Sequence, residues 1–271
     1  MSNRKRLVLF HEHCIDGFTA AWTAWRRYGD DAEYLPVNHG GPRPDVRDRD
    51  LLILDFAYPR EEMLVMAERA SSIRVLDHHT TAQADLAGLP FATFDMERSG
   101  AGIAWDELHP GKERPWLVDY VEDRDLWRFK LPHSKAINAW IGAMIREGFP
   151  TWDGLLLVGP EDSRKAGYAV LAYVDRYVHE MAETARRVTF ERYDHVPIVN
   201  APYLMISELL QHLAKDAPLA IGWFQRADGM YQYSLRSSDR SSVDVSEIAK
   251  RFGGGGHKHA AGFQLADKGA W

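Results

Sequence analysis

Short apolar runs alternate with helical patterns along the first half of the chain. Two segments, Phe18–Tyr28 and Arg60–Ala70, repeat apolar residues with the period of an amphipathic helix. A further helix is predicted from an N-cap at Ser99 through Leu108. The strand-like runs around these helices are Arg6–Phe10, Glu33–Val37, Leu51–Asp55, Ser72–Asp77 and Phe91–Phe94. This alternation predicts an α/β fold whose first domain has a mostly parallel sheet flanked by helices.

A long helical pattern follows this first region. Gly159-Pro160 places a proline where the first turn of a helix tolerates it, and apolar residues then recur at helical spacing as far as Val188. We therefore predict a helical connector over residues 146–188. It would join a first domain at residues 1–145 to a second domain at residues 189–271.

The last third of the chain has the pattern of a smaller α/β domain with a mixed sheet. Two strand-like segments, Leu219–Arg226 and Met230–Arg236, flank Asp228-Gly229, which is a strong signal for a two-residue hairpin turn. A helix follows that Asp244 is placed to cap and that ends at Phe252.

Composition limits the classes of protein to which the chain can belong. The single cysteine, Cys14, excludes an intrachain disulfide and favours a reducing compartment. No apolar run approaches the roughly 20 residues that span a membrane, and the basic residues near the N-terminus precede only a short apolar run. We therefore expect a cytoplasmic protein that does not enter the membrane. A net charge of −6 argues against a broad basic surface for duplex DNA.

Acids and histidines follow several of the predicted strands. Asp16 lies in the loop after the first strand, Asp55 ends the third, and Asp77-His78-His79 ends the fourth. Each of them alone fits a turn residue or a helix cap. In a parallel sheet, however, they would converge on one edge, and Asp123 would have to reach them from a later loop. Carboxylates that close repel one another unless cations neutralise them.

This arrangement predicts a centre for divalent metal ions. Aspartate and histidine ligands without a thiolate cluster favour Mn²⁺ or Mg²⁺, with Zn²⁺ and Co²⁺ as alternatives. The number of candidate ligands is greater than one ion requires, so we expect two ions.

A glycine run near the end of the chain is a second candidate site. Gly253–Gly256 would allow backbone N–H groups to approach an anion closely, and His257 follows directly. The alternative is a flexible hinge. Arg236, at the end of the predicted hairpin, is placed to grip a phosphate, although a surface arginine fits the same pattern.

The order of these motifs resembles the DHH phosphoesterase family. In the first region the motifs are His11-x-x-Cys14-x-Asp16-Gly17, Leu54-Asp55-Phe56, Asp77-His78-His79 and Asp123-Arg124-Asp125. In the second region, Leu235-Arg236-Ser237, the glycine run with His257, and His259–Phe263 are similar to the DHH-associated domain of that family. The resemblance spans nearly the whole chain. It implies a DHH catalytic, metal-binding domain at residues 1–145 and a DHH-associated, substrate-binding domain at residues 189–271.

The resemblance also implies a role for each matching residue in a two-metal hydrolase that usually uses Mn²⁺. The implied metal ligands are His11, Asp16, Asp55, His78 and Asp123. Asp55 would bridge the ions, while Asp77 and His79 would support the ligands or contact the phosphate. The implied substrate-binding residues are Arg236, Gly254, Gly255, Gly256 and His257. Further candidates without an assigned role are His13, Cys14, Ser99 and Asp125.

The first loop departs from the commoner family pattern. Cys14 stands where many members have an aspartate. Two alternatives follow: Cys14 is itself a ligand, or a water molecule replaces the missing carboxylate.

The favoured hypothesis is a metal-dependent phosphoesterase that hydrolyses phosphodiester bonds of short oligonucleotides or dinucleotides. Its expected partner is a short single-stranded oligonucleotide or a nucleotide. One alternative is a nucleotide phosphatase or a phosphoanhydride hydrolase that acts on pyrophosphate or polyphosphate. Another is a non-catalytic nucleotide-binding regulator in which Cys14 disables one metal site. The sequence leaves open whether two copies of the chain form a homodimer.

Overall fold

The computed structural model describes residues 5–12, 14–39, 41–144 and 148–269. The chain divides into two compact units, Met1–Leu171 and Ala172–Trp271. This division falls inside helix α7 (Phe149–Ala182) and therefore within the predicted connector at residues 146–188. The boundary predicted after residue 145 lies outside the described residues.

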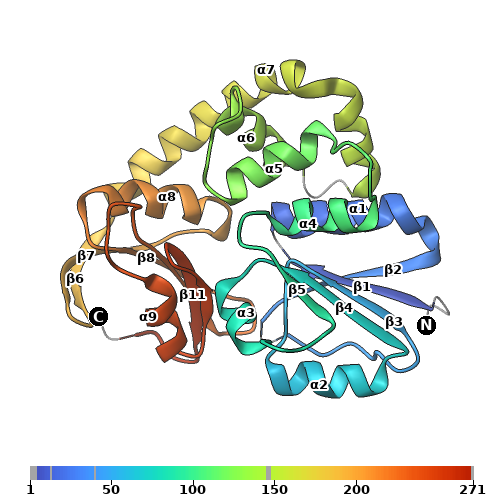
Figure 1. The fold of residues 1–271 in the computed structure, drawn as a ribbon. Coiled ribbons are helices and arrows are strands. Elements are labelled where there is room, and N and C mark those ends of the chain that lie inside the picture. The colour runs from blue at the N-terminus through green and yellow to red at the C-terminus, as the bar shows by residue number, and fades with distance from the viewer. Residues whose placement is uncertain (1–4, 13, 40, 145–147, 270–271) are drawn as a thin grey trace. The chain divides into compact units, whose positions relative to one another are not determined.

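The first unit is built on a five-stranded sheet with the order β2-β1-β3-β4-β5 (Figure 1). In chain order, the strands are β1 (Arg6–His11), β2 (Ala32–Val37), β3 (Asp50–Leu54), β4 (Ser72–Asp77) and β5 (Ala92–Phe94). Every pairing between neighbours in this sheet is parallel. The predicted parallel sheet is confirmed, and each strand agrees with the predicted range to within one residue at either end.

Helices cover both faces of this sheet. On one face lie α1 (Ile15–Tyr28) and α4 (Gly100–Leu108), with α5 (Trp116–Asp125), α6 (Ser134–Met144) and the first part of α7 packed beyond them (Figure 1). The other face carries α2 (Arg60–Arg69) and α3 (Thr80–Asp85). Neighbouring residues of one strand, such as Leu52 and Ile53, belong to different cores. Because successive side chains alternate between the faces, a strand buried on both sides is apolar throughout.

The helices agree less well with the sequence patterns. Ser99 does cap α4, because its Oγ accepts a hydrogen bond from the Gly102 N–H at 3.2 Å. The patterns did not reveal α5 and α6. Helix α7 begins earlier than predicted and is interrupted at Gly159, whose φ of 77° and ψ of 168° are not helical. The predicted continuation to Val188 is wrong, because Arg186–Phe190 pairs with the second sheet as a strand.

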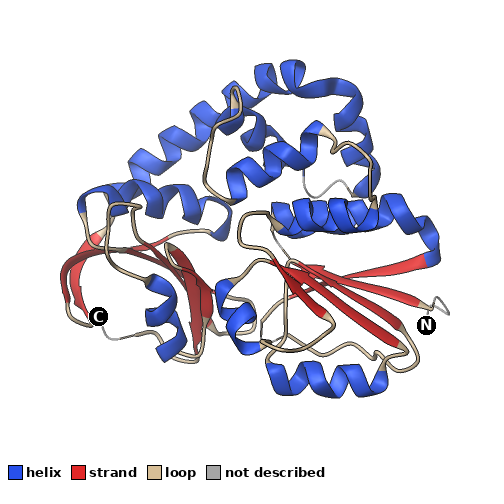
Figure 2. Ribbon diagram, in the orientation of Figure 1, coloured by secondary structure: helices blue, strands red, loops and turns tan. Residues whose placement is uncertain are grey.

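The second unit contains a six-stranded mixed sheet with the order β10-β11-β9-β8-β7-β6. Its strands are β6 (Arg186–Phe190), β7 (Tyr193–Asn200), β8 (Ala220–Gln225), β9 (Tyr231–Arg236), β10 (Gly255–His257) and β11 (Ala260–Leu265). β7 and β8 pair in parallel, and the other neighbours pair antiparallel. Helices α8 (Ile206–Leu213) and α9 (Val245–Arg251) contribute to two separate cores of this unit. Figure 2 shows the helices of the protein in blue and its strands in red.

Short 3-10 helices complete the secondary structure; they are Gly29–Asp31, Tyr203–Met205 and Ala214–Asp216. Among the described residues, no helix combines the length and the apolar character needed to cross a membrane.

The predicted hairpin joins β8 to β9, but its turn is longer than expected. The Gly229 N–H donates to the Arg226 carbonyl at 3.0 Å, and the Arg226 N–H donates to the Met230 carbonyl at 2.8 Å. Gly229 has a φ of 86°, which is the left-handed conformation that such a turn requires in its last residue. The loop therefore holds three residues rather than two.

Both ends of α9 form as predicted. The Asp244 carboxylate accepts hydrogen bonds from the Ser246 and Glu247 N–H groups at 2.9 and 3.4 Å. After Phe252 the chain turns through Gly253, whose φ is 76°. The Gly253 and Gly254 N–H groups donate to the carbonyls of the last helical turn, as in a Schellman motif. The first glycine of the run thus has a structural role.

We expect Asp244→Ala to lower the stability of the second unit by about 1 kcal/mol, because it removes the side-chain oxygen that caps α9. Urea unfolding of the full chain, followed by far-UV circular dichroism, measures the change. Asp239→Ala, at an exposed loop position nearby, is the matched control. Equal midpoints for the two variants would show that the cap contributes nothing.

Candidate metal centre

The predicted metal ligands of the first unit lie at the carboxyl ends of its strands. His11 is the last residue of β1, Asp55 follows β3 directly, and Asp77-His78-His79 stands at the end of β4. Asp16 lies in the first turn of α1. Since β3 lies between β1 and β4, these side chains gather at one edge of the sheet, as the sequence predicted.

The ligand atoms form two clusters. The first comprises His11, Asp55 and His79, and the second comprises Asp16, His78 and Asp125; within each cluster the atoms lie within 4.8 Å of one another. Asp55 faces both clusters, because its Oδ2 is 3.6 Å from His11 Nδ1 and its Oδ1 is 3.2 Å from His78 Nε2. Such a position suits a ligand that two ions share.

An unusual backbone conformation directs the Asp55 side chain toward both clusters. Its φ is 54°, a left-handed value that is uncommon for residues other than glycine but that aspartate tolerates better than most. Its N–H donates to the Leu76 carbonyl at 2.9 Å, so the turn remains tied to β4. Backbone strain of this kind often occurs at functional sites.

Two glycines leave room for the carboxylates. A Cβ atom on Gly100 would lie 2.6 Å from Asp55 Cβ and 2.8 Å from Asp16 Oδ2. A Cβ atom on Gly17 would lie 2.6 Å from the His11 carbonyl oxygen and 3.1 Å from Asp55 Oδ2. A side chain at either position would displace a candidate ligand, and the sequence patterns did not identify Gly100.

The start of helix α4 supports Asp16. The Ala101 N–H donates to Asp16 Oδ1 at 3.1 Å, and the positive end of the helix dipole favours a carboxylate there. Ser99, a candidate from the sequence, caps this helix. Its role in the structure is therefore to hold the helix end that contacts Asp16.

The charges at this edge fit a cation site. Asp16 and Asp55 are each only 1% exposed. Asp16 Oδ2 and both carboxylate oxygens of Asp55 accept no hydrogen bond of regular geometry from the described part of the chain. Burial, together with the charges of Asp125 and Asp55, raises the pKa of Asp16 well above its usual value. Burial also raises the pKa of Asp125. Bound divalent ions would neutralise the negative charges of these carboxylates and so remove their mutual repulsion.

Asp77 orients His79. Its carboxylate accepts hydrogen bonds from the His78 N–H at 2.8 Å and from the His79 side chain, through Nδ1, at 2.7 Å. Burial alone would raise the pKa of Asp77, but the charge and hydrogen bond of His79 outweigh it and lower this pKa. With Nδ1 held by Asp77, Nε2 is the nitrogen through which His79 can bind a ligand or exchange a proton.

The structure places Asp125, rather than Asp123, among the ligand atoms. Asp125 Oδ2 is 3.4 Å from His78 Nε2. The carboxylate of Asp123 accepts hydrogen bonds from the N–H groups of Lys130 and Leu131 at 2.9 and 3.2 Å, so it holds the loop after α5. Both acids lie in the last turn of α5, where residues two apart point roughly 200° apart around the helix axis. The structure therefore brings Asp125, and not the predicted Asp123, beside the other candidate ligands.

Cys14 belongs to neither ligand cluster of the first unit. It stands at the N-cap position of α1. Burial raises the pKa of its thiol well above the usual value, and the charges of Asp55, Asp125 and Asp16 raise it further. A thiol binds metal as the thiolate, which these charges disfavour. His13, the other unassigned candidate of this loop, lies outside the described residues.

An aromatic wall that the sequence patterns missed lies beside the first cluster. The ring centroids of Phe56 and His39 lie 5.9 and 6.3 Å from that of His11. His39 lies in the loop that follows β2, the strand next to β1 at the same sheet edge. The sequence did contain one indication of its role, because His39 follows the end of a predicted strand, as the candidate ligands do.

The candidate substrate-binding residues of the second unit occupy one row of its sheet. His257 pairs with Ala260, and Ala260 pairs with Arg236. Residues that pair directly across strands point to the same face. Arg236 and His257 therefore share a face, with only the small side chain of Ala260 between them.

The glycines before His257 serve the pairing of β10 with β11. A Cβ atom on Gly254 would lie 2.0 Å from the Gly262 carbonyl oxygen, and Gly256 has a φ of 137°. Gly255 pairs with Gly262 as the first residue of β10. The segment is a strand rather than a flexible hinge.

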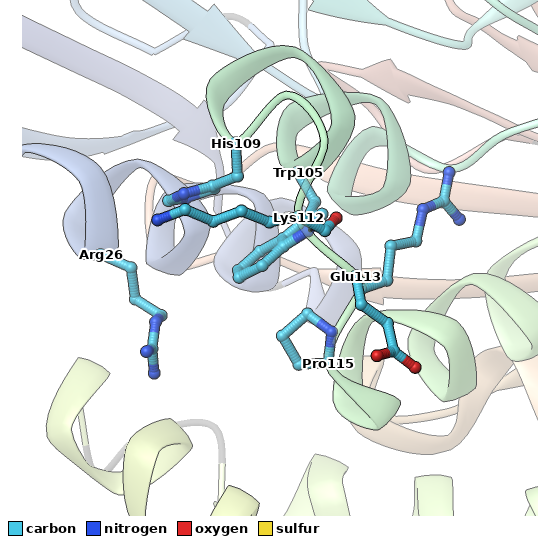
Figure 3. Close-up of a pocket in the computed structure, with 7 residues that line it drawn as sticks. Arg26, Trp105, His109, Lys112, Glu113 and Pro115 are labelled. Carbon is cyan, nitrogen blue, oxygen red and sulfur yellow. Dashed lines mark hydrogen bonds between the residues drawn. The ribbon is translucent and has the colours of Figure 1, made fainter.

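A separate hollow of about 350 Å³ lies on the first unit, lined in part by Arg26, Trp105, His109 and Lys112 (Figure 3). It contains no candidate residue from the sequence. Its two arginines already pair with acids: Arg26 with Asp153 at 2.8 Å, and Arg114 with Glu122 at 3.1 Å. We assign it no ligand.

Comparison with known proteins identifies the second unit and the fold. A family model described as the DHHA1 domain matches residues 199–270. An uncharacterized protein of Acanthamoeba polyphaga mimivirus is 29% identical over 286 aligned positions, which cover 96% of this chain and 67% of that protein.

Among solved structures, RecJ from Thermus thermophilus in complex with Mn²⁺ matches with a TM-score of 0.56 and 16% identity, over 97% of this chain and 50% of that chain. A second structure, of exonuclease RecJ bound to manganese, matches with a TM-score of 0.51 and 15% identity, over 97% of this chain and 86% of that chain. At these identities the likeness establishes a shared fold.

We expect Gly100→Ala to weaken the binding of Mn²⁺ by about 10- to 100-fold, the range found when groups that hold metal ligands are changed. The added methyl group would press on Asp55 and Asp16. Isothermal titration with Mn²⁺ measures the affinity. Gly154→Ala, at a helical position with no atom within 4 Å of the new Cβ, is the matched control and should bind Mn²⁺ normally. Equal affinities for the two variants would contradict the packing argument.

Proposed function

We propose that this chain is a phosphoesterase of the DHH type, namely a metal-dependent hydrolase of phosphodiester bonds in short oligonucleotides or dinucleotides. The observation that carries the proposal is the pair of ligand clusters that meet at Asp55. Buried carboxylates without regular hydrogen-bond donors, next to imidazole nitrogens, have the composition of a hydrolytic metal centre.

We assign the ligands as two sets that share one residue. His11, Asp55 and His79 would hold one ion, and Asp16, His78 and Asp125 the other, with Asp55 common to both. The oxygen and nitrogen donors suit Mn²⁺, which both RecJ structures contain, while Mg²⁺, Co²⁺ and Zn²⁺ are compatible with the same ligands. When bound, such ions polarise phosphoryl oxygens and lower the pKa of water.

The side chains of the protein would complete the site. Asp77 fixes the ring of His79 through Nδ1, which leaves Nε2 as the nitrogen that His79 would present to the ion of the first set. The N-terminus of α4 keeps Asp16 in place. In the second unit, Arg236 and His257 are proposed to bind a phosphate or base of the substrate, since they share one face of the sheet.

The proposal is tested by hydrolysis of a substrate panel with Mn²⁺. The panel contains a 5′-phosphorylated dinucleotide, a pentanucleotide, a longer single strand, a cyclic dinucleotide, adenosine bisphosphate and polyphosphate. We expect the dinucleotide and pentanucleotide to be the best substrates. Asp55→Asn should abolish their turnover while the fold is retained, because it removes the shared negative charge; Asp31→Asn, on the exposed surface, is the control.

Each other outcome of the panel identifies an alternative. If only adenosine bisphosphate or polyphosphate is hydrolysed, the protein is a phosphatase or a phosphoanhydride hydrolase rather than a phosphodiesterase. Absence of any Mn²⁺-stimulated hydrolysis, with less than one ion bound per chain, would indicate a nucleotide-binding regulator.

Asp125→Asn and Asp123→Asn should have different effects. The first should sharply reduce metal binding and turnover without loss of stability, because Asp125 faces His78. The second should lower stability by about 1–3 kcal/mol, since it weakens the acceptor of two loop N–H groups. Metal titration and urea unfolding of both variants measure the two effects. The reverse pattern would restore Asp123 as the ligand.

A further inference from the structure

We propose that His39 and Phe56 form a stacking subsite for a nucleobase of the substrate beside the candidate metal centre. This inference rests on the proposed function, because it concerns the part of the substrate next to the reacting phosphate. Such a subsite would favour substrates that carry a base over those that consist of phosphate alone.

Phe56 is the fixed part of this subsite. It follows Asp55 in the chain and is 1% exposed. Its ring meets that of Tyr58 edge to face, with centroids 4.9 Å apart and planes at 82°. It also lies 5.9 Å from the ring of His11. Phe56 is thus a buried ring with contacts on two sides, on which a neighbouring ring can rest.

His39 is the accessible part. Its ring lies against Phe56, with centroids 4.6 Å apart and planes at 37°, while the residue as a whole is exposed. Exposed histidines usually sample several rotamers, whereas this ring has a buried aromatic surface to rest on. The arrangement offers a flat, solvent-facing ring in a defined place.

The loop that carries His39 is anchored to the metal-site loop. The Asn38 side-chain amide donates to the carboxylate of Glu12, and the Glu12 N–H donates to the Val37 carbonyl at 3.0 Å. Glu12 is the neighbour of His11 in the chain. These contacts couple the position of His39 to that of a candidate metal ligand.

This geometry favours an aromatic ligand over a phosphate. His39 contributes a ring face, and Arg43, the arginine that acts electrostatically on it, is already paired with Glu62. Bases stack on exposed aromatic rings with little dependence on their identity. The centroid of His39 is 6.3 Å from that of His11, so a nucleoside attached to a phosphate at the first cluster would bring its base to this ring.

The test compares one dinucleotide with matched forms in which either base is replaced by hydrogen, leaving an abasic sugar. We expect His39→Ala to lower kcat/KM for the intact dinucleotide by about tenfold, mainly through KM. It should leave kcat/KM unchanged for the abasic form that lacks the stacked base. His39→Phe should restore the intact substrate, because it keeps a ring at this position. Tyr173→Ala, which removes an exposed ring from α7, is the control.

An equal loss on intact and abasic substrates would overturn the subsite, as would a folded His39→Phe enzyme that shows no rescue. Equal turnover of all three substrates by the unchanged protein would also overturn it. These results differ from failure of the proposed function, in which the unchanged protein hydrolyses none of the diesters with Mn²⁺.

Discussion

The repulsion among buried carboxylates at one sheet edge is the constraint on which the first unit depends. Asp16, Asp55 and Asp125 meet around His78, and burial prevents water from screening their charges. The positive end of α4 reduces the repulsion at Asp16. Small residues such as Gly100 allow the close approach. The need to relieve this repulsion therefore accounts for features of the backbone as well as of the side chains.

The sequence predicts the sheets well because their signals are local. A strand such as Ser72–Asp77, buried on both faces, appears as an apolar run between polar turns. The helices were predicted less completely, because α5 and α6 were missed and α7 was misplaced. The stripe ending at Val188 fits a helix in isolation, yet Arg186–Phe190 pairs as a strand with β7, which follows it directly in the chain. Pairing within a sheet overrides local periodicity, so such an error cannot be corrected from the segment itself.

The residues of the candidate centre were predictable only in part, because some of them are positioned by contacts distant from their own segment. Strand ends place Asp55 and His78 reliably, because all parallel strands of a sheet end at the same edge. The choice between Asp123 and Asp125 depends on the rotation of α5 about its axis, which the packing of the whole helix sets. His39 reaches the centre through a loop whose path depends on Glu12 and Phe56. The sequence thus identifies groups at strand ends, and it misses those whose position depends on helix packing or on the path of a loop.

The adjacency of Asp55 and Phe56 has a consequence for substitutions at this edge of the sheet. The left-handed turn at Asp55 directs the carboxylate to the metal ligands and the next ring to the aromatic wall, so one backbone conformation determines both. A substitution that alters this turn would disturb both residues at once. The loop after β2 does not share that turn. Exchange of His39 would therefore change the ring beside the candidate centre while Asp55 and Phe56 keep their places.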